Sequence, residues 1–332
     1  MTTLLELKEK LTRFYGKYDI YIIPVIKFAV ALAAFLLINH NIGYMEKISS
    51  TPIALILALI CSILPLGGTI FIGSVLILAD MYALSLEVCV VALILFILIY
   101  ILYFRFSPKN EYGVLLTPIC FGLNIPFVMP VGMGLLRELY SAFSLICGII
   151  LYFFLNGVKQ NEAALGGVDE KDAATSKIVV ALNQLLGNRE MYLVLAIMVV
   201  TLVIVYIIRR MSIEHAWAIA IIFGILFEAV GMVAGDMVLG ISGKTVSILI
   251  GSIISCVIAF VIQFFFFNLD YSRTERLQFE DDEYYYYVKA VPKAIVAGTD
   301  KRVTRFNGKE EQERMNKKRF AEEMEIDEDL LD

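Results

Sequence analysis

The stretch Pro52–Ala79, PIALILALICSILPLGGTIFIGSVLILA, decides the fold of this chain. It carries no charged residue, yet Pro65-Leu66-Gly67-Gly68 interrupts it, and this sequence cannot continue a regular helix. A helix needs about 20 apolar residues to span a hydrocarbon core of roughly 30 Å. Each arm is too short to cross comfortably, so we predict a broken helical hairpin over residues 52–79.

A second broken stretch, residues 113–136, repeats this plan with a break at Leu123-Asn124-Ile125-Pro126. The residues predicted to lie at the two breaks, near the middle of a membrane, are Pro65, Gly67, Gly68, Asn124 and Pro126. Gly73, Leu76, Ala83, Ser85 and Leu86 recur 59 residues later as Gly132, Leu135, Ala142, Ser144 and Leu145. The match indicates an inverted repeat of hairpin and crossing, although a chance match in an apolar sequence is an alternative.

Six further apolar segments predict membrane crossings. They are residues 20–39, 86–104, 140–156, 191–208, 215–235 and 246–267. Hydrophobic residues make up 59% of the chain and charged residues 18%, outside the range of soluble domains, and the mean hydropathy is +0.77. The sequence therefore predicts an all-α integral membrane protein with about six transmembrane helices and two broken, re-entrant helical hairpins.

The positions of Lys and Arg predict the orientation, because these residues accumulate on the cytoplasmic side. Four basic clusters would be cytoplasmic: Lys8 to Lys17, Arg105 with Lys109, Arg209 with Arg210, and Arg273 with Arg276. Re-entrant hairpins and paired short crossings both keep all four clusters on one side, and the sequence leaves both open. Both termini are then cytoplasmic, and residues 156–190 form an extracytoplasmic loop whose amphipathic patch, Lys177–Leu186, could be a short helix.

Residues 1–19 place leucines and aromatic residues on one helical face and lysines on the others. This pattern predicts an amphipathic helix at the cytoplasmic interface, lying either on the inner leaflet or on the protein itself.

Two ionisable residues within the apolar part are candidate functional groups. Glu228 lies near the middle of its helix, where a carboxylate needs a partner or a proton, and it is a candidate coupling or gating group. Lys27 could extend to the cytoplasmic interface or form a buried ion pair with Glu228. The two histidines have no metal-ligand spacing to Cys or carboxylates, so no metal and no cofactor are expected. No catalytic motif is present, and we do not expect an enzyme.

Small residues at four-residue spacing mark close helix contacts in the last two helices: Gly231 with Gly235, and Gly251 with Ser255 and Ala259. They predict that these helices pack on each other or on a second copy of the chain.

Residues 269–332 form a charged cytoplasmic tail. Its acidic cluster, Glu280, Asp281, Asp282 and Glu283, precedes Tyr284, Tyr285, Tyr286, Tyr287 and Val288. The tyrosines and valine favour a β-strand. That strand could add to a partner's sheet or form a hairpin with residues 294–297.

The segment Phe279–Lys293 resembles the tail of uncharacterised polytopic membrane proteins of clostridial Gram-positive bacteria. The resemblance extends through the last three helices, with Arg209-Arg210 and the junction Tyr271–Arg276. It implies a bacterial cytoplasmic membrane and implies nothing about mechanism.

The sequence favours a non-enzymatic scaffold that sits in the lipid bilayer and presents its tail to a cytoplasmic protein. The alternative is a transporter or channel that uses the two oppositely oriented hairpins and Glu228. The acidic balance of the tail excludes nucleic acid as the expected partner.

Overall fold

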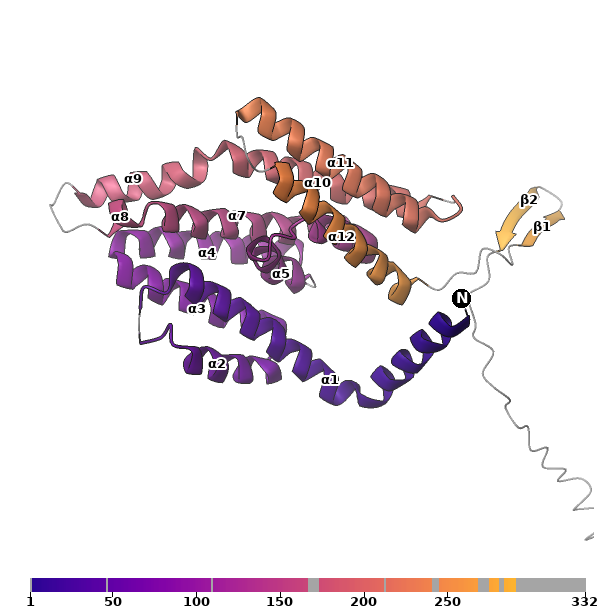
Figure 1. Cartoon of the computed structure of the whole chain (residues 1–332), viewed down its shortest axis with the longest axis horizontal. Coiled ribbons are helices and arrows are strands. Elements are labelled where there is room, and N and C mark those ends of the chain that lie inside the picture. The colour runs from indigo at the N-terminus through magenta and orange to yellow at the C-terminus, as the bar shows by residue number, and fades with distance from the viewer. Residues whose placement is uncertain are drawn as a thin grey trace, which may run out of the picture. The chain divides into compact units, whose positions relative to one another are not determined.

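The computed structural model describes residues 2–45, 47–108, 110–166, 173–211, 213–240, 245–267, 275–280 and 284–290. Helices dominate these ranges, and two strands form a small antiparallel sheet (Figure 1). The helices are α1 (Thr2–Ile42), α2 (Thr51–Ile63), α3 (Leu66–Leu84), α4 (Leu86–Phe106), α5 (Glu111–Gly122), α6 (Val128–Leu136), α7 (Ser141–Gln160), α8 (Glu162–Leu165), α9 (Ala173–Leu186), α10 (Arg189–Arg210), α11 (Ala216–Leu239) and α12 (Thr245–Phe266). The strands are β1 (Glu275–Glu280) and β2 (Tyr285–Ala290).

Seven helical segments of the described residues are long and apolar enough to cross a membrane. They are Leu7–Ile42, Leu66–Leu84, Leu86–Phe106, Ser141–Gln160, Lys177–Arg210, Ala216–Leu239 and Thr245–Phe266. Each of the six predicted crossings corresponds to one of these segments, so the expected all-α membrane architecture is confirmed. The additional segment is α3, which the sequence pattern ended at Ala79.

Helix α3 is longer than predicted because Asp80 does not end it. The Asp80 carboxylate accepts hydrogen bonds from the Met45 backbone N–H at 3.0 Å and from Ser49 Oγ at 3.2 Å. With this carboxylate bonded, the helix continues to Leu84, and Ser85 then caps the start of α4. Helix α3 has 19 residues, a length of about 28 Å, whereas α2 has only 13.

Positively charged side chains tie several helix ends together at one end of the helical part, which we call the basic end. Lys8 Nζ donates to backbone oxygens at the end of α12, including Phe267 O at 3.0 Å. Arg209, in the last turn of α10, donates to Arg137 O just after α6 at 2.7 Å. The rings of Trp217 and Phe267 lie 5.0 Å apart and join the start of α11 to the end of α12.

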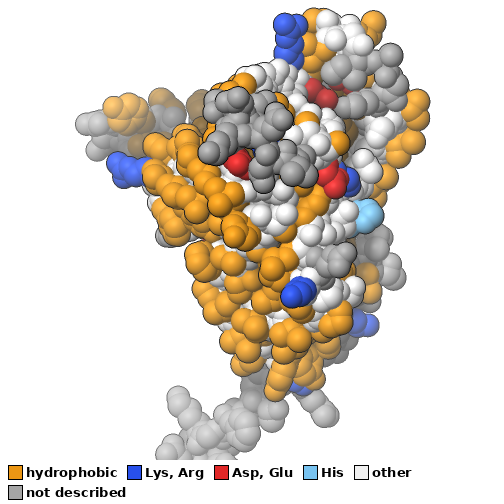
Figure 2. All heavy atoms as spheres, turned by 90° about the vertical axis from the view of Figure 1, so that its left-hand side faces the viewer, with side chains coloured by type: hydrophobic (Ala, Val, Ile, Leu, Met, Phe, Trp, Pro, Cys, Tyr) orange, Lys and Arg blue, Asp and Glu red, His pale blue; other side chains and the backbone are white. Residues whose placement is uncertain are grey.

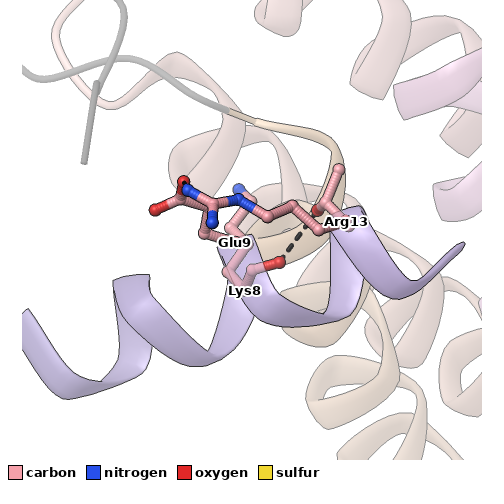
Figure 3. Close-up of polar contacts among 4 residues, drawn as sticks. Lys8, Glu9 and Arg13 are labelled. Carbon is pink, nitrogen blue, oxygen red and sulfur yellow. Dashed lines mark hydrogen bonds and ion pairs between the residues drawn. The ribbon is translucent and has the colours of Figure 1, made fainter. Parts of the chain in front are cut away.

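Helix α1 contains both the predicted N-terminal helix and the first predicted crossing. Tyr18 has non-helical backbone angles (φ −120°, ψ 21°) and divides α1 at the predicted boundary. Before this kink, Glu9 and Arg13 form an ion pair one turn apart on the same side of the helix (Figure 3). Because Lys8 binds the end of α12, the contact favours the interpretation in which this segment packs on the protein.

Polar side chains hold the connections at the other end, which we call the opposite end. Asn39 Nδ2 donates to Ser49 O across the α1–α2 connection at 3.2 Å. Lys159 Nζ, in the last turn of α7, donates to Asn41 Oδ1 near the end of α1 at 2.9 Å. Figure 2 looks onto this end, where charged side chains and a histidine lie among hydrophobic ones.

We call α2 with α3 hairpin 1. Its tip, Leu64–Gly68, lies close to the basic end. Ser74 Oγ and the Tyr100 hydroxyl are 2.9 Å apart and align the antiparallel helices α3 and α4. Gly67 lies about 10 Å along α3 from Ser74, and this places it level with the last turn of α4. A Cβ on Gly67 would lie 3.2 Å from Oε1 of Glu111, the first residue of α5. Pro65, Gly67 and Gly68 are therefore nearer one end than the predicted middle position.

We call α5 with α6 hairpin 2. It starts at the basic end and turns back before the opposite end. Helix α5 has 12 residues, about 18 Å, and α6 has 9. The tip contains Asn124 in a left-handed conformation (φ 60°), which asparagine adopts more readily than most residues. Gly251 permits close approach of α12, since a Cβ there would lie 3.0 Å from the Asn124 carbonyl oxygen. Gly251 is about 9 Å along α12 from its start, so the tip stops short of the opposite end.

The small residues of α11 and α12 were predicted to join these two helices to each other or to a second copy of the chain. Most of them instead contact other helices of the same chain. A Cβ on Gly231 would lie 3.4 Å from Ile197, and one on Gly235 would meet Leu193, so both glycines approach α10. Ser255 and Ala259 are fully buried, and Ala259 packs in a cluster with residues of α6, α10 and α11. Helices α11 and α12 do contact each other. However, Gly231 and Gly235 allow close contact with α10, and Gly251 allows close contact with hairpin 2. The contacts are internal to one copy of the chain.

The predicted repeat does not align the helix boundaries. Ser85 is the residue between α3 and α4, whereas its counterpart Ser144 lies inside the first turn of α7. Helix α3 is also much longer than α6. An inverted repeat therefore stays a prediction from sequence, without support from these boundaries.

The predicted helix in residues 177–186 lies within α9, which packs against α4 and α7. Ala181 and Leu185 of α9 are buried there. The loop predicted for residues 156–190 is thus largely helical in its described part, since α7 itself continues to Gln160.

The tyrosine segment forms a strand, but its partner is the preceding segment. In the antiparallel register, Leu277 lies opposite Val288 and Phe279 opposite Tyr286. The partner expected from the sequence, residues 294–297, lies outside the described residues, as do Asp281, Asp282 and Glu283.

Candidate functional site

A cavity of about 290 Å³ lies between α1, α3, α4, α5 and α7. Most of its lining is apolar and includes the rings of Phe35, Phe96 and Phe121. The volume is at the lower limit of small-molecule sites, which measure about 300–1,000 Å³. An apolar cavity with a few polar groups is the usual form of a ligand site, so this cavity is the candidate functional site.

One end of the cavity is polar and lies at the opposite end of the helices. We call this end the mouth, and it is lined by His40, Asn41, Asn156 and Lys159. Lys159 is exposed, and its contact with Asn41 brings the last turns of α1 and α7 together. Among the described residues that line the cavity, none is Asp or Glu.

The other end of the cavity, which we call the floor, is close to the basic end. Thr69 and Ser74 of α3 and Tyr100 of α4 line it, and both α3 residues are buried. Ser74 Oγ donates to Ile70 O at 2.8 Å and also bonds the Tyr100 hydroxyl. The lining residues of α3 run from Thr69 to Ile77, about 12 Å along the helix. The cavity therefore extends along less than half of the length of α3.

The tip of hairpin 1 lies beyond the floor, and two charged residues hold it. Lys27 Nζ of α1 donates to Leu64 O at 3.1 Å, at the end of α2, where Pro65 supplies no N–H to continue the helix. Glu111 lies beside Gly67 in the first turn of α3. A cation at a helix C-terminus and a carboxylate at a helix N-terminus are each the favourable sign for the helix dipole. These two side chains therefore stabilise the broken backbone that closes the cavity.

Hairpin 2 contributes a wall of the cavity. Asn124 lines it, and Phe121 stacks on Tyr152 of α7 with ring centroids 4.5 Å apart. Pro126, the other residue predicted for this break, does not line the cavity.

Acidic groups at the opposite end gather around Tyr44 and do not line the mouth. Burial, followed by the negative charges of Glu162 and Asp80, raises the pKa of Tyr44 to about 12. Lys159 therefore lines the mouth without an acidic residue beside it in the described lining.

Glu228 lies away from the cavity, on the side of α11 that faces α10. Its neighbours on the same face show this: a Cβ on Gly224 would meet Val205, and one on Gly231 would meet Ile197. Glu228 is fully buried, and neither carboxylate oxygen accepts a hydrogen bond from the described residues. A bare charge would be costly there, so a proton or a cation would have to accompany it.

The predicted ion pair between Lys27 and Glu228 does not form. Lys27 instead bonds to Leu64 O, because the carbonyl at the broken end of α2 needs a donor and lies closer to the basic end. Of the predicted site residues, the structure brings Asn124 to the cavity and Lys27 to the hairpin that closes it.

Most of the cavity lining is not predictable from the sequence. Lys159, His40, Ser74 and Tyr100 come from four separate helices, and no spacing along the chain connects them. The one available signal was the occurrence of polar residues near the ends of apolar helices, which ordinary hydration also explains.

No protein-family model, no curated protein and no solved structure matches this chain.

Replacing Lys27 by methionine should lower the stability of the protein. The Leu64 carbonyl oxygen would lose a charged donor, and we expect a loss of about 1–2 kcal/mol in the free energy of unfolding. Thermal unfolding of the purified protein in detergent measures the change. Lys10→Met is the matched control, since Lys10 is an exposed lysine of the same helix. Equal unfolding temperatures for the two variants would contradict the role of Lys27.

Replacing Glu228 by methionine should leave the unfolding temperature unchanged or raise it. A buried carboxyl group without a hydrogen-bond partner carries a desolvation cost of about 1–3 kcal/mol that methionine does not carry. The same unfolding experiment tests this, with Glu138→Met at an exposed position as the control. A strong loss of stability in Glu228→Met alone would mean that the carboxylate holds a bound cation or another partner.

Proposed function

We propose that this chain is a multi-pass protein of a bacterial cytoplasmic membrane and admits a small solute into the cavity between its helices, as a transporter does. The cavity is the single observation that carries this proposal. It has a polar mouth with the exposed Lys159 at one end, extends about 12 Å along α3, and ends at Thr69, next to the broken tip of hairpin 1. A transporter open to one side has this arrangement, with non-helical backbone enclosed in protein.

The charge distribution supports an orientation with the mouth outside. The basic end carries Lys8, Lys10, Arg105, Arg137, Arg209 and Arg210. Because positive residues accumulate on the cytoplasmic side, the basic end faces the cytoplasm in this proposal. The first part of α1 and the tail after α12 then lie on that side.

The two hairpins have different roles in this proposal. Hairpin 2 is a re-entrant element, because α5 and α6 are both too short to cross. Hairpin 1 acts as the inner closure, since its tip separates the floor from the basic end. Opening toward the cytoplasm would require the tip to move from Lys27 and Glu111.

Cysteine labelling tests the aqueous path through the mouth. In a background without native cysteines, Asn41→Cys at the mouth and Ser74→Cys at the floor should react in intact cells with a small membrane-impermeant thiol reagent. Thr201→Cys should not react, because Thr201 is buried outside the cavity. Lys10→Cys should react only after the cells are permeabilised.

A cavity-filling substitution sharpens this experiment. Gly73 lines the cavity, and a Cβ there meets only Phe35 and Ile38 at ordinary contact distances of 3.7 and 4.0 Å. Adding Gly73→Leu should slow the reaction of Ser74→Cys and leave that of Asn41→Cys unchanged. Absence of reaction at Ser74→Cys without the added leucine would overturn the proposal.

A second function, presentation of the tail to a cytoplasmic protein, is favoured by the β1–β2 hairpin. Tyr285 and Tyr287 lie on one face opposite Glu280 and Gln278, and Tyr287 is 79% exposed. A two-stranded sheet is marginal by itself, and an added strand from a partner would cover its free edge.

Substitution of the exposed tyrosines tests this second function. The double variant Tyr285→Thr with Tyr287→Thr keeps β-forming residues but removes the aromatic surface, and it should abolish co-purification of the cytoplasmic partner from the native host. Deletion of residues 309–332 is the control and should retain the partner. Retention by the tyrosine variant and by a deletion of residues 279–332 would contradict the scaffold function.

A further inference from the structure

We propose that the cavity takes an organic anion, a carboxylate with a compact apolar body, and holds the carboxylate at the mouth beside Lys159. This inference rests on the proposed function and specifies the class of solute. Four features of the cavity carry it: the charge at the mouth, the amides beside that charge, the apolar walls and the neutral floor.

The charge of the lining favours an anion. Lys159 is the cation of the mouth, and no described lining residue carries a carboxylate that could balance it. The Asp80 carboxylate of α3 accepts hydrogen bonds from Met45 and Ser49, which belong to the α1–α2 connection. The Glu162 carboxylate is close enough to Tyr44 to raise the pKa of that tyrosine, and it does not line the cavity. An organic cation entering the mouth would therefore meet Lys159 without a compensating acid.

The present contact of Lys159 indicates how a carboxylate would bind. Its Nζ donates to the neutral Asn41 Oδ1 at 2.9 Å. A carboxylate oxygen in place of that amide oxygen would form a charge-assisted hydrogen bond, which is shorter and about twice as strong as a neutral one. The freed amide of Asn41, together with Asn156, could then donate to the second carboxylate oxygen.

The walls set the chemistry of the rest of the ligand. Below the mouth, the lining includes Phe35, Phe96, Phe121 and Tyr152 from four different helices. Aromatic walls of this kind suit a flat or branched apolar group. The volume of about 290 Å³ limits that group to a compact body.

The polar groups of the floor determine which end of the ligand points toward it. Ser74 Oγ and the Tyr100 hydroxyl already bond each other, and Ser74 also bonds Ile70 O. These neutral groups offer little to a charged head group, whereas the mouth offers a cation and two amides. The apolar body therefore points toward the floor.

Protection of Ser74→Cys from the thiol reagent tests the inference with a readout that does not need transport. The full chain in lipid nanodiscs is incubated with 3-phenylpropionate, 3-phenylpropanol or 3-phenylpropylammonium, which share one apolar body and differ in charge. We expect the carboxylate to protect at a concentration about tenfold lower than the alcohol, a difference that corresponds to about 1.4 kcal/mol, and the ammonium to protect least.

The variant Lys159→Gln should remove the preference for the carboxylate and leave protection by the alcohol unchanged. Lys47→Gln is the matched control, because Lys47 is an exposed lysine of the same end that does not line the cavity. Equal protection by all three compounds, the strongest protection by the ammonium, no protection by any of them, or a preference that survives Lys159→Gln would each overturn the inference.

The outcomes separate this inference from the proposed function. If Ser74→Cys reacts and is slowed by Gly73→Leu but shows no preference for the carboxylate, the open cavity stands and the anion does not. If Ser74→Cys does not react at all, the cavity is closed to water, and the proposed function and this inference fail together.

Discussion

A helix that breaks inside a membrane leaves carbonyl and N–H groups without partners, and in hydrocarbon each such group costs several kcal/mol. Hairpin 1 meets this constraint with the Lys27 side chain at the end of α2 and with Glu111 beside the start of α3. Both side chains belong to other elements, α1 and α5. The tip is therefore positioned by its neighbours, and the floor of the cavity depends on that position.

Hairpin 2 solves the same problem by packing. Its tip lies against α12, where Gly251 lets the Asn124 carbonyl oxygen come close, and against α1, where a Cβ on Gly122 would lie 3.2 Å from Leu37. The two hairpins thus enter from different ends and are held differently, one by charged side chains and the other by close backbone contact. The cavity is enclosed by α3 of hairpin 1, α5 of hairpin 2 and the helices α1, α4 and α7. This division separates the cavity from the α10–α11 contact that buries Glu228.

Local sequence rules predicted much of the fold. Apolar length identified six of the seven long apolar segments of the described residues, and Pro65 and the Asn124 turn marked both breaks, because these signals act over a few residues. The failures concern contacts between distant segments. The charge of Asp80 indicates a helix edge in the sequence, because its partners Met45 and Ser49 lie far away along the chain. The tyrosine segment pairs with β1, whereas the sequence favoured residues 294–297 or a partner's sheet.

The candidate site was less predictable for the same reason. Glu228 and Lys27 are conspicuous in sequence because each is a lone charge in an apolar segment, yet the structure gives them different surroundings. The polar residues of the cavity are inconspicuous, since His40, Asn156 and Lys159 lie near helix ends where water would satisfy them equally well. Only the three-dimensional arrangement shows that they converge on one opening.

The contact of Lys8 with the end of α12 has a consequence for how the protein is made. Lys8 and its acceptor residue Phe264 are separated by 256 residues in sequence. Nearly the whole chain must therefore leave the ribosome before this contact can form. Until then, the first residues of the chain lack this contact, and the early helices must insert without it. The joining of the first segment to the last helix is therefore a late step of biogenesis, and it is available only to chains whose synthesis has run through α12.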